Sequence, residues 1–191
     1  MKKSLVASML VLSPFTVMAD EPSYNYVEGG YYQLDLDDAE FKGYQLRGSL
    51  AFSENLYGRL GYWAADDTFT LFNTDIDVDL SELSAGLGFK TPVGANTSVH
   101  TYADLVQSRI DVEGNDDSET DYRLGFGLRS NVAESVELFS DITWTDYDVD
   151  NETALQVGGV FHINKAFGIT VSAGLNDEND KNYTVGARLS F

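Results

Sequence analysis

The nine residues from Tyr183 to Phe191 alternate without a break between two kinds of side chain. Tyr, Val, Ala, Leu and Phe occupy the odd positions, and Thr, Gly, Arg and Ser occupy the even positions. Successive side chains of a β-strand point to opposite faces, so this pattern predicts a strand with one apolar and one polar face. The same period of two recurs along a chain in which aromatic residues make up 13% and prolines number only 3. These features favour an all-β fold.

Two kinds of connection separate ten such segments. The predicted strands cover residues 24–35, 43–53, 56–66, 78–90, 97–110, 119–130, 136–147, 153–163, 167–176 and 182–191. Short connections rich in Asn, Ser, Pro and Gly lie at 53–55, 91–96, 131–135 and 164–166. Acidic residues gather at 35–40, 66–79, 111–121, 146–152 and 177–180, and we interpret these five segments as longer loops.

Short turns on one side, long loops on the other and an even number of strands are typical of transmembrane barrels. We therefore predict a single antiparallel up-and-down transmembrane β-barrel with ten strands. An eight-stranded barrel is the alternative if one hairpin is misread. A soluble β-sandwich would show similar alternation, but the asymmetry of the connections argues against it.

One face of the predicted strands is apolar along most of the chain, as a lipid-exposed surface requires. It is built by Leu46, Leu50, Phe52, Leu56, Leu60, Tyr62, Leu83, Ala85, Leu87, Phe89, Leu124, Phe126, Leu128, Leu138, Ile142, Trp144, Leu155, Val157, Phe161, Ile163, Phe167, Ile169, Val171 and Leu175. Aromatic residues gather near the strand ends, as in the girdles at membrane interfaces.

The opposite face carries most of the charged strand residues. Its members are Glu28, Arg47, Arg59, Glu82, Asp104, Asp121, Arg123, Arg129, Glu137, Asp141 and Arg188. Charges inside a narrow barrel are costly unless they are paired, so we expect arginine–carboxylate networks across the lumen. Tyr102 and Phe139 share this face and would fill it further. The network is either a polar plug that holds the barrel together, which we favour, or a constriction that selects solutes.

The N-terminal segment has the features of a secretory signal peptide. Lys2 and Lys3 precede an apolar run from Leu5 to Met18, and small residues precede a predicted cleavage after Ala19. The predicted domains are a signal peptide (1–19) and an outer-membrane barrel (20–191). Loss of the two lysines would change the net charge from −19 to −21, which argues against nucleic-acid binding. Cysteine is absent, which excludes disulfides and thiol chemistry.

No motif points to catalysis, a cofactor or a specific metal. The runs Asp75–Asp79 and Asp146–Asp150 alternate carboxylates as a loose cation site would, but they lack the glycine and glutamate of an EF-hand. Both histidines, His100 and His162, lie near predicted short turns and have no neighbouring serine nucleophile. We therefore expect no metal site, no cofactor and no enzymatic activity.

Two stretches resemble a known protein family. The segment Tyr24–Tyr31 is similar to the first strand of small proteobacterial outer-membrane β-barrels, which are porin-like and related in style to OmpA and OmpX. The ending from Val185 to Phe191 resembles their assembly signal, with Val185, Gly186, Leu189 and Phe191 as the candidate residues. The resemblance implies a Gram-negative outer membrane, contact with lipid and lipopolysaccharide, and recognition by the barrel-assembly machinery. We expect a monomer.

Three functions are compatible with this sequence. The favoured one is a structural barrel or a narrow, cation-preferring pore with acidic extracellular loops. The first alternative is an adhesion or surface-recognition protein that acts through those loops. The second is a lipid-modifying outer-membrane enzyme.

Overall fold

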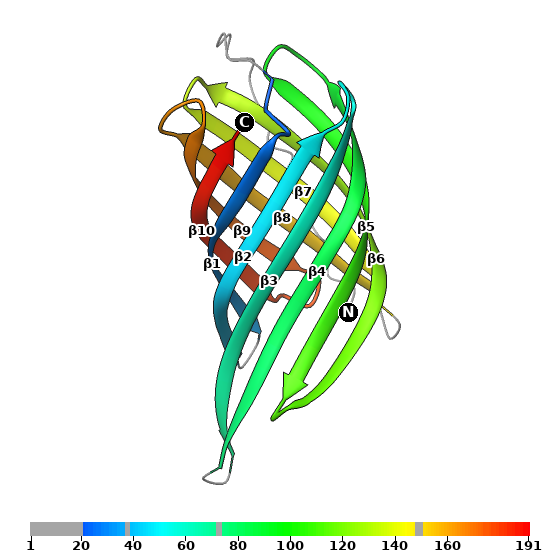
Figure 1. The fold of residues 1–191 in the computed structure, drawn as a ribbon, viewed down its shortest axis with the longest axis vertical. Coiled ribbons are helices and arrows are strands. Elements are labelled where there is room, and N and C mark those ends of the chain that lie inside the picture. The colour runs from blue at the N-terminus through cyan, green and yellow to red at the C-terminus, as the bar shows by residue number, and fades with distance from the viewer. Residues whose placement is uncertain (1–20, 37–38, 72–73, 148–150) are drawn as a thin grey trace, which may run out of the picture.

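The computed structural model describes residues 21–36, 39–71, 74–147 and 151–191, and they form a closed antiparallel β-barrel (Figure 1). Its ten strands are β1 (Tyr26–Leu36), β2 (Ala39–Ala51), β3 (Leu56–Leu71), β4 (Thr74–Pro92), β5 (Thr97–Val112), β6 (Asn115–Ala133), β7 (Val136–Asp146), β8 (Asn151–His162), β9 (Phe167–Asn176) and β10 (Lys181–Ser190). Each strand pairs with its neighbours in sequence, and β1 pairs with β10 to close the ring. The predicted ten-stranded barrel is confirmed. The predicted signal peptide lies outside the described residues.

The four short connections all lie at one end of the barrel, here called the turn end, which also holds the C-terminus (Figure 1). They fall between β2 and β3, β4 and β5, β6 and β7, and β8 and β9. The connection predicted at 131–135 is shorter than expected, because β6 continues to Ala133 through a bulge between Asn131 and Ala133. No helix among the described residues is long and apolar enough to cross a membrane.

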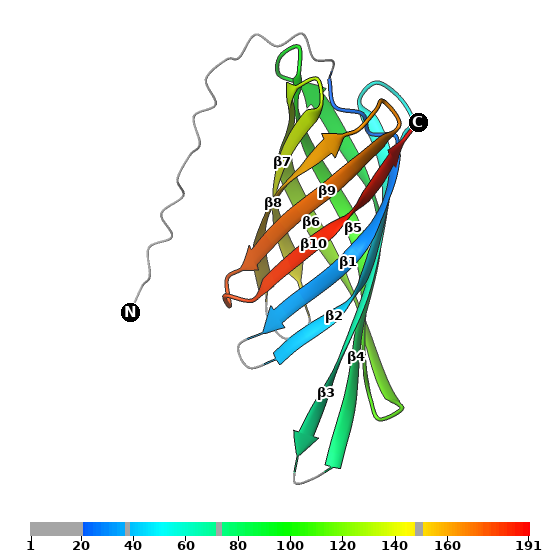
Figure 2. The ribbon, with the colours of Figure 1, turned by 90° about the vertical axis from the view of Figure 1, so that its left-hand side faces the viewer.

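At the opposite end, here called the hairpin end, the prediction of long acidic loops is wrong. The acidic segments 66–79 and 111–121 belong mostly to strands, and β3–β4 and β5–β6 project as long hairpins beyond the other strands (Figure 2). Parts of the segments 35–40 and 146–152 also belong to strands, since β1 ends at Leu36, β2 begins at Ala39, β7 ends at Asp146 and β8 begins at Asn151. The segment 177–180 lies entirely outside the strands.

The physical reason for the extra strand length is alternation within the acidic runs. On β4, Asp75, Asp77 and Asp79 alternate with Ile76, Val78 and Leu80, so one face of the hairpin is acidic and the other apolar. Val78 and Leu80 pack against a small cluster centred on buried Tyr32, Phe41 and Ala65, with Leu34, Leu36, Ala39, Trp63 and Phe69 around it. Charge suggested loops, but the period of two decides the structure.

The polarity of the inner and outer faces reverses along β3, although each face keeps its direction. Towards the turn end, Leu60 faces out and Arg59 faces the lumen; past Tyr62 and Trp63, Asp66 faces out and Ala65 faces in. The rings of Tyr44 and Tyr62, which are tilted against each other with centroids 5.9 Å apart, lie at this change. Since an outer surface that is apolar suits lipid and one that is acidic suits water, the reversal marks where the wall leaves the membrane.

Elsewhere the outer surface is apolar, as predicted. Large side chains that face away from the lumen are exposed on every strand, among them Leu46 and Leu60, Leu87 and Leu105, Phe126 and Ile142, Val157 and Val171, and Val185. The charged residues of the opposite parity face inward, where most of them are buried.

Candidate functional site

Of the eleven charged residues that the sequence places on the inner face, all but Asp121 form the predicted charge network, and these ten lie on the lumen side of the wall. They come from eight of the ten strands. Seven of them line a cavity of about 290 Å³, which reaches from Tyr24 at the turn end to Leu36 at the hairpin end. Six of the ten are buried: Glu28, Glu82, Asp104, Arg129, Glu137 and Arg188. Arg47, Arg59, Arg123 and Asp141 are half-buried on the same side of the wall.

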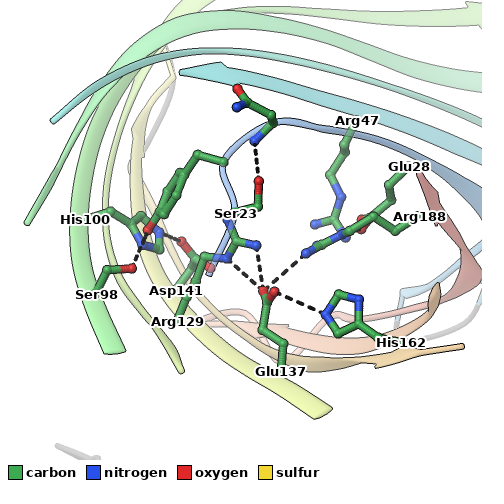
Figure 3. A network of polar contacts seen from close by, with 12 residues as sticks. Ser23, Glu28, Arg47, Ser98, His100, Arg129, Glu137, Asp141, His162 and Arg188 are labelled. Carbon is green, nitrogen blue, oxygen red and sulfur yellow. Dashed lines mark hydrogen bonds and ion pairs between the residues drawn. The ribbon is translucent and has the colours of Figure 1, made fainter. Parts of the chain in front are cut away.

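A chain of four charged side chains crosses the lumen near the turn end (Figure 3). Arg188 on β10 donates to Glu28 on β1 at 2.8 Å and to Glu137 on β7 at 3.2 Å. Arg129 on β6 donates to the same Glu137 at 2.8 Å. We call these four residues the crossing chain. In a ring of ten strands β6 lies opposite β1, so the crossing chain bridges the barrel from wall to wall.

Two further groups extend the crossing chain. Arg47 on β2 forms an ion pair with Glu28, so this carboxylate lies between two arginines. His162 approaches Glu137 at 3.8 Å from the other side. Glu28 and Glu137 have only 2% of their side-chain surface exposed, and charges so deeply buried need several partners each.

A second layer of ion pairs lies nearer the hairpin end. Arg123 holds both carboxylate oxygens of Glu82, at 2.9 and 2.7 Å, and donates to Thr145. Two parallel hydrogen bonds fix the orientation of a guanidinium better than a single bond does. Arg59 pairs with Asp104 at 3.3 Å, and its guanidinium lies 3.5 Å from the centre of the Tyr102 ring.

Glycine makes room for this layer. A Cβ atom on Gly125 would lie 2.1 Å from the ring of Tyr102, and one on Gly88 would lie 2.1 Å from the ring of Tyr57. These aromatic rings therefore lie flat against bare backbone, and they narrow the lumen further.

A third polar group contains residues that sequence reasoning did not connect. His100 Nε2 lies 2.7 Å from Asp141, its Nδ1 lies 3.1 Å from the Tyr24 hydroxyl, and that hydroxyl lies 3.0 Å from Ser98. If Nε2–H of His100 donates to Asp141, Nδ1 accepts from Tyr24. Burial raises the pKa of Tyr24 to about 12, which keeps its hydroxyl protonated and able to donate.

The signal that could have found this group is parity. Ser98 and His100 share the inward face of β5 with Tyr102, and Tyr24 has the parity of Tyr26 and Glu28. The alternating pattern placed these residues on the lumen side, but it carries no information on which strands face each other across the lumen. The pairs Arg123–Glu82 and His100–Asp141 depend on that second kind of information.

The candidate assembly residues lie on the closing strand. Val185, Leu189 and Phe191 have 57%, 54% and 66% of their surface exposed on the outside of the barrel. Gly186 packs against the backbone of β1, because a Cβ there would lie 2.3 Å from the carbonyl oxygen of Gly29. Their role in assembly stays a prediction.

Comparisons with known proteins agree with this architecture. The sequence matches the model of the family described as "Outer membrane protein beta-barrel domain" over residues 4–158. No curated protein matches the sequence.

Solved structures with a similar fold include the NanC porin, with a TM-score of 0.53, 9% identity, and coverage of 87% of this chain and 99% of that one. The KdgM porin has a TM-score of 0.51 and 14% identity, with coverage of 87% of this chain and 99% of that one. The translocator domain of the autotransporter NalP from Neisseria meningitidis has a TM-score of 0.50 and 11% identity, with coverage of 89% of each chain. At such identities the likeness shows the fold alone.

Proposed function

The chain belongs to the outer membrane protein beta-barrel domain family, and we propose that it forms a narrow pore in the outer membrane that passes ions, cations in preference, and excludes sugars. The turn end faces the periplasm and the hairpin end faces the outside, as in barrels with short periplasmic turns. Cleavage after Ala19 gives the mature protein, and lipopolysaccharide contacts its outer wall.

The crossing chain is the observation that carries this proposal. Glu28, Arg188, Glu137 and Arg129 bridge the lumen from β1 to β6, and we expect them to block the passage of a hydrated sugar. Barrels of about eight strands are filled by their own side chains, and ten strands add little width. Ions can pass between charged side chains that rearrange, whereas larger solutes cannot.

The cation preference rests on the acidic hairpins. Asp66, Asp79, Asp111 and Asp116 stand directly opposite one another on β3, β4, β5 and β6, in one row across four strands. A second pair, Thr68 and Asp77, follows nearer the tip. Carboxylates aligned in this way attract cations to the hairpin end and repel anions, within the screening length of the salt.

The test compares the parent barrel with a loosened crossing chain. Glu137→Gln removes the charge that holds Arg129 and Arg188 together, so single-channel conductance in a planar bilayer should rise above that of the parent. Glu40→Gln, in an exposed ion pair with Lys42, is the matched control and should leave conductance unchanged. Liposome swelling should show no uptake of sugars by the parent. Rapid sugar uptake by the parent would contradict the proposal.

A second candidate function is recognition of cationic partners at the cell surface. The observation that favours it is the projection of the β3–β4 and β5–β6 hairpins beyond the rest of the barrel, with their acidic outer face (Figure 2). Two results together would favour this function over the pore. The barrel would show no conductance, and it would bind cationic peptides in a way that is lost when the row of aspartates is changed to asparagine.

We also propose that the chain is not an enzyme. The two histidines support this view, because His100 is buried between Tyr24 and Asp141 and His162 lies beside Glu137. Neither has a serine, threonine or cysteine nucleophile as its hydrogen-bond partner among the described residues.

A further inference from the structure

Residues Glu21 to Asn25, which precede β1, fold into the lumen at the turn end instead of leading away from the barrel. Pro22 is fully buried and Tyr24 has only 4% of its surface exposed. Both belong to an irregular segment, and such segments are usually exposed on a protein surface. The burial therefore requires specific contacts between this segment and the barrel wall.

Tyr24 makes most of these contacts. Its ring centroid lies 4.7 Å from that of Tyr57 on β3 and 5.9 Å from that of His100 on β5. The guanidinium of Arg129 on β6 lies 4.5 Å from the ring centre, and its hydroxyl bonds to Ser98 and His100. One side chain thus contacts three strands of the wall and a member of the crossing chain.

The two ends of the segment are anchored separately. Glu21 forms an ion pair with Lys90 on β4 at 2.8 Å, and the Lys90 ammonium also lies 4.9 Å from the Tyr24 ring. Asn25 accepts a hydrogen bond from the Ala51 amide at 2.7 Å and, through its carbonyl, one from the Phe191 amide at 3.1 Å. Asn25 therefore fixes the segment to the rim next to β1, while residues 21–24 are held to the barrel by side chains.

We propose that residues 21–24 are a gate: a cork that closes the turn-end mouth of the lumen and swings out about Asn25 to open it. The gating role rests on the proposed pore, whereas the position of residues 21–24 in the lumen does not. The cork and the crossing chain meet at Arg129, so the segment covers the side of the crossing chain that faces the turn end.

The cork can open without unfolding the barrel. Its contacts with the described residues of the wall are two ring contacts, two cation–π contacts, one ion pair and the hydrogen bonds of one hydroxyl, and none of them belongs to the strand pairing. Segments held in this way open locally at a free energy below that of global unfolding. The long ladders between strands stay intact when residues 21–24 leave.

Chemical labelling tests the cork independently of conductance. The chain has no cysteine, so Ser49→Cys introduces one thiol on the lumen wall at the turn end. Ser49 is buried, and its hydroxyl has no hydrogen-bond partner to lose among the described residues. In detergent-solubilised barrels, a charged methanethiosulfonate should label this thiol slowly in the parent background. Tyr24→Ala and deletion of residues 21–24 should each raise the rate about tenfold or more, which corresponds to about 1.4 kcal/mol on the opening equilibrium.

Two controls separate the cork from a general loosening. Ala95→Cys, in the exposed turn between β4 and β5, should react at one rate in all backgrounds. Tyr183→Ala removes an outward-facing tyrosine and should leave labelling of Ser49→Cys unchanged. Equal rates with and without residues 21–24, or the same acceleration from Tyr183→Ala, would overturn the cork.

Conductance then tests the gating role. Glu21→Cys with Lys90→Cys allows the segment to be tied to the wall by a cleavable bis-maleimide. The tied barrel should show fewer openings, and cutting the linker with reductant should restore them. If the parent conducts and neither the linker nor the deletion changes its conductance, the gate is overturned and the pore stands. If no variant conducts and the deletion of residues 21–24 still speeds the labelling of Ser49→Cys, the pore and the gating role are overturned. The cork, as a segment that closes the mouth of the lumen, would remain.

Discussion

At the scale of single residues, some lumen arginines pair with carboxylates on strands that are not adjacent to their own, in addition to the pairs between neighbouring strands. Arg123 on β6 reaches past β5 to Glu82 on β4, and Arg188 on β10 reaches past β9 and β8 to Glu137 on β7. Such pairs tie the far parts of a narrow barrel together. They also make each charge dependent on its partner, because a buried ion without its counterion is costly.

Arg123→Ala should lower the free energy of unfolding by roughly 3–5 kcal/mol, because it leaves the carboxylate of Glu82 buried and unpaired. Urea titrations in lipid vesicles measure this. Replacing both partners, as in Arg123→Met with Glu82→Met, should recover much of the loss. Glu40→Ala, in an exposed pair, should have little effect. If Arg123→Ala unfolds like the parent, the lumen is hydrated and the ion pairs do not stabilise it.

Gly125→Ala tests the close approach between backbone and ring. The added methyl would lie 2.1 Å from the Tyr102 ring, which in turn carries the guanidinium of Arg59. We expect a loss of about 1–3 kcal/mol in unfolding free energy from this overpacking. Gly94→Ala is the control, because no described residue other than its chain neighbours lies within 4 Å of its new methyl group. Equal stability of the two variants would show that Tyr102 can move freely.

At the scale of elements, the alternating pattern was sufficient to predict ten strands and the face on which each side chain lies. It failed where a second signal competed with it. The aspartates of β3, β4, β5 and β6 suggested loops, yet Ile76, Val78 and Leu80 keep the period of two. Val78 and Leu80 also pack against the apolar cluster formed by β1, β2 and β3. Charge density alone does not distinguish a solvated loop from a hairpin with one solvated face.

Phe69→Ala should loosen the β3–β4 hairpin without unfolding the barrel. Phe69 contacts Phe41, with ring centroids 5.9 Å apart, in the apolar cluster at the hairpin end. Limited proteolysis of barrels in vesicles should cut the variant within the hairpin faster than the parent. The heat-modifiable barrel band should persist. A cooperative loss of the whole barrel would mean that the cluster is part of the main folding unit.

At the scale of the whole molecule, the pairing of β10 with β1 makes the barrel closed, from Tyr26 opposite Ser190 to Asp35 opposite Lys181. Closure removes free strand edges, which lipid cannot satisfy with hydrogen bonds. The sequence predicted that arginines and carboxylates would pair across the lumen, but neither the cork nor the partner of each charge could be predicted, because both depend on contacts across the interior and not on the order of residues along one strand.

Deletion of Phe191 should lower the fraction of protein that is folded in the outer membrane. The residue ends the apolar face formed by Val185, Ala187 and Leu189 on β10, which we expect the assembly machinery to recognise. Its amide also bonds to Asn25. Membrane fractionation with heat-modifiability gels measures the effect. Normal levels of heat-modifiable protein would refute the assembly role, and Ser190→Ala serves as a control for changes near the end.

The reversal potential under a salt gradient is the most direct test of the narrow, cation-preferring pore. Single barrels in a planar bilayer, with more salt on one side, should give a reversal potential of the sign expected for cations. The preference should weaken as total salt rises, since salt screens the aspartate row. Changing Asp66, Asp79, Asp111 and Asp116 together to asparagine should move the reversal potential towards zero. An anion-selective current from the parent would contradict the account.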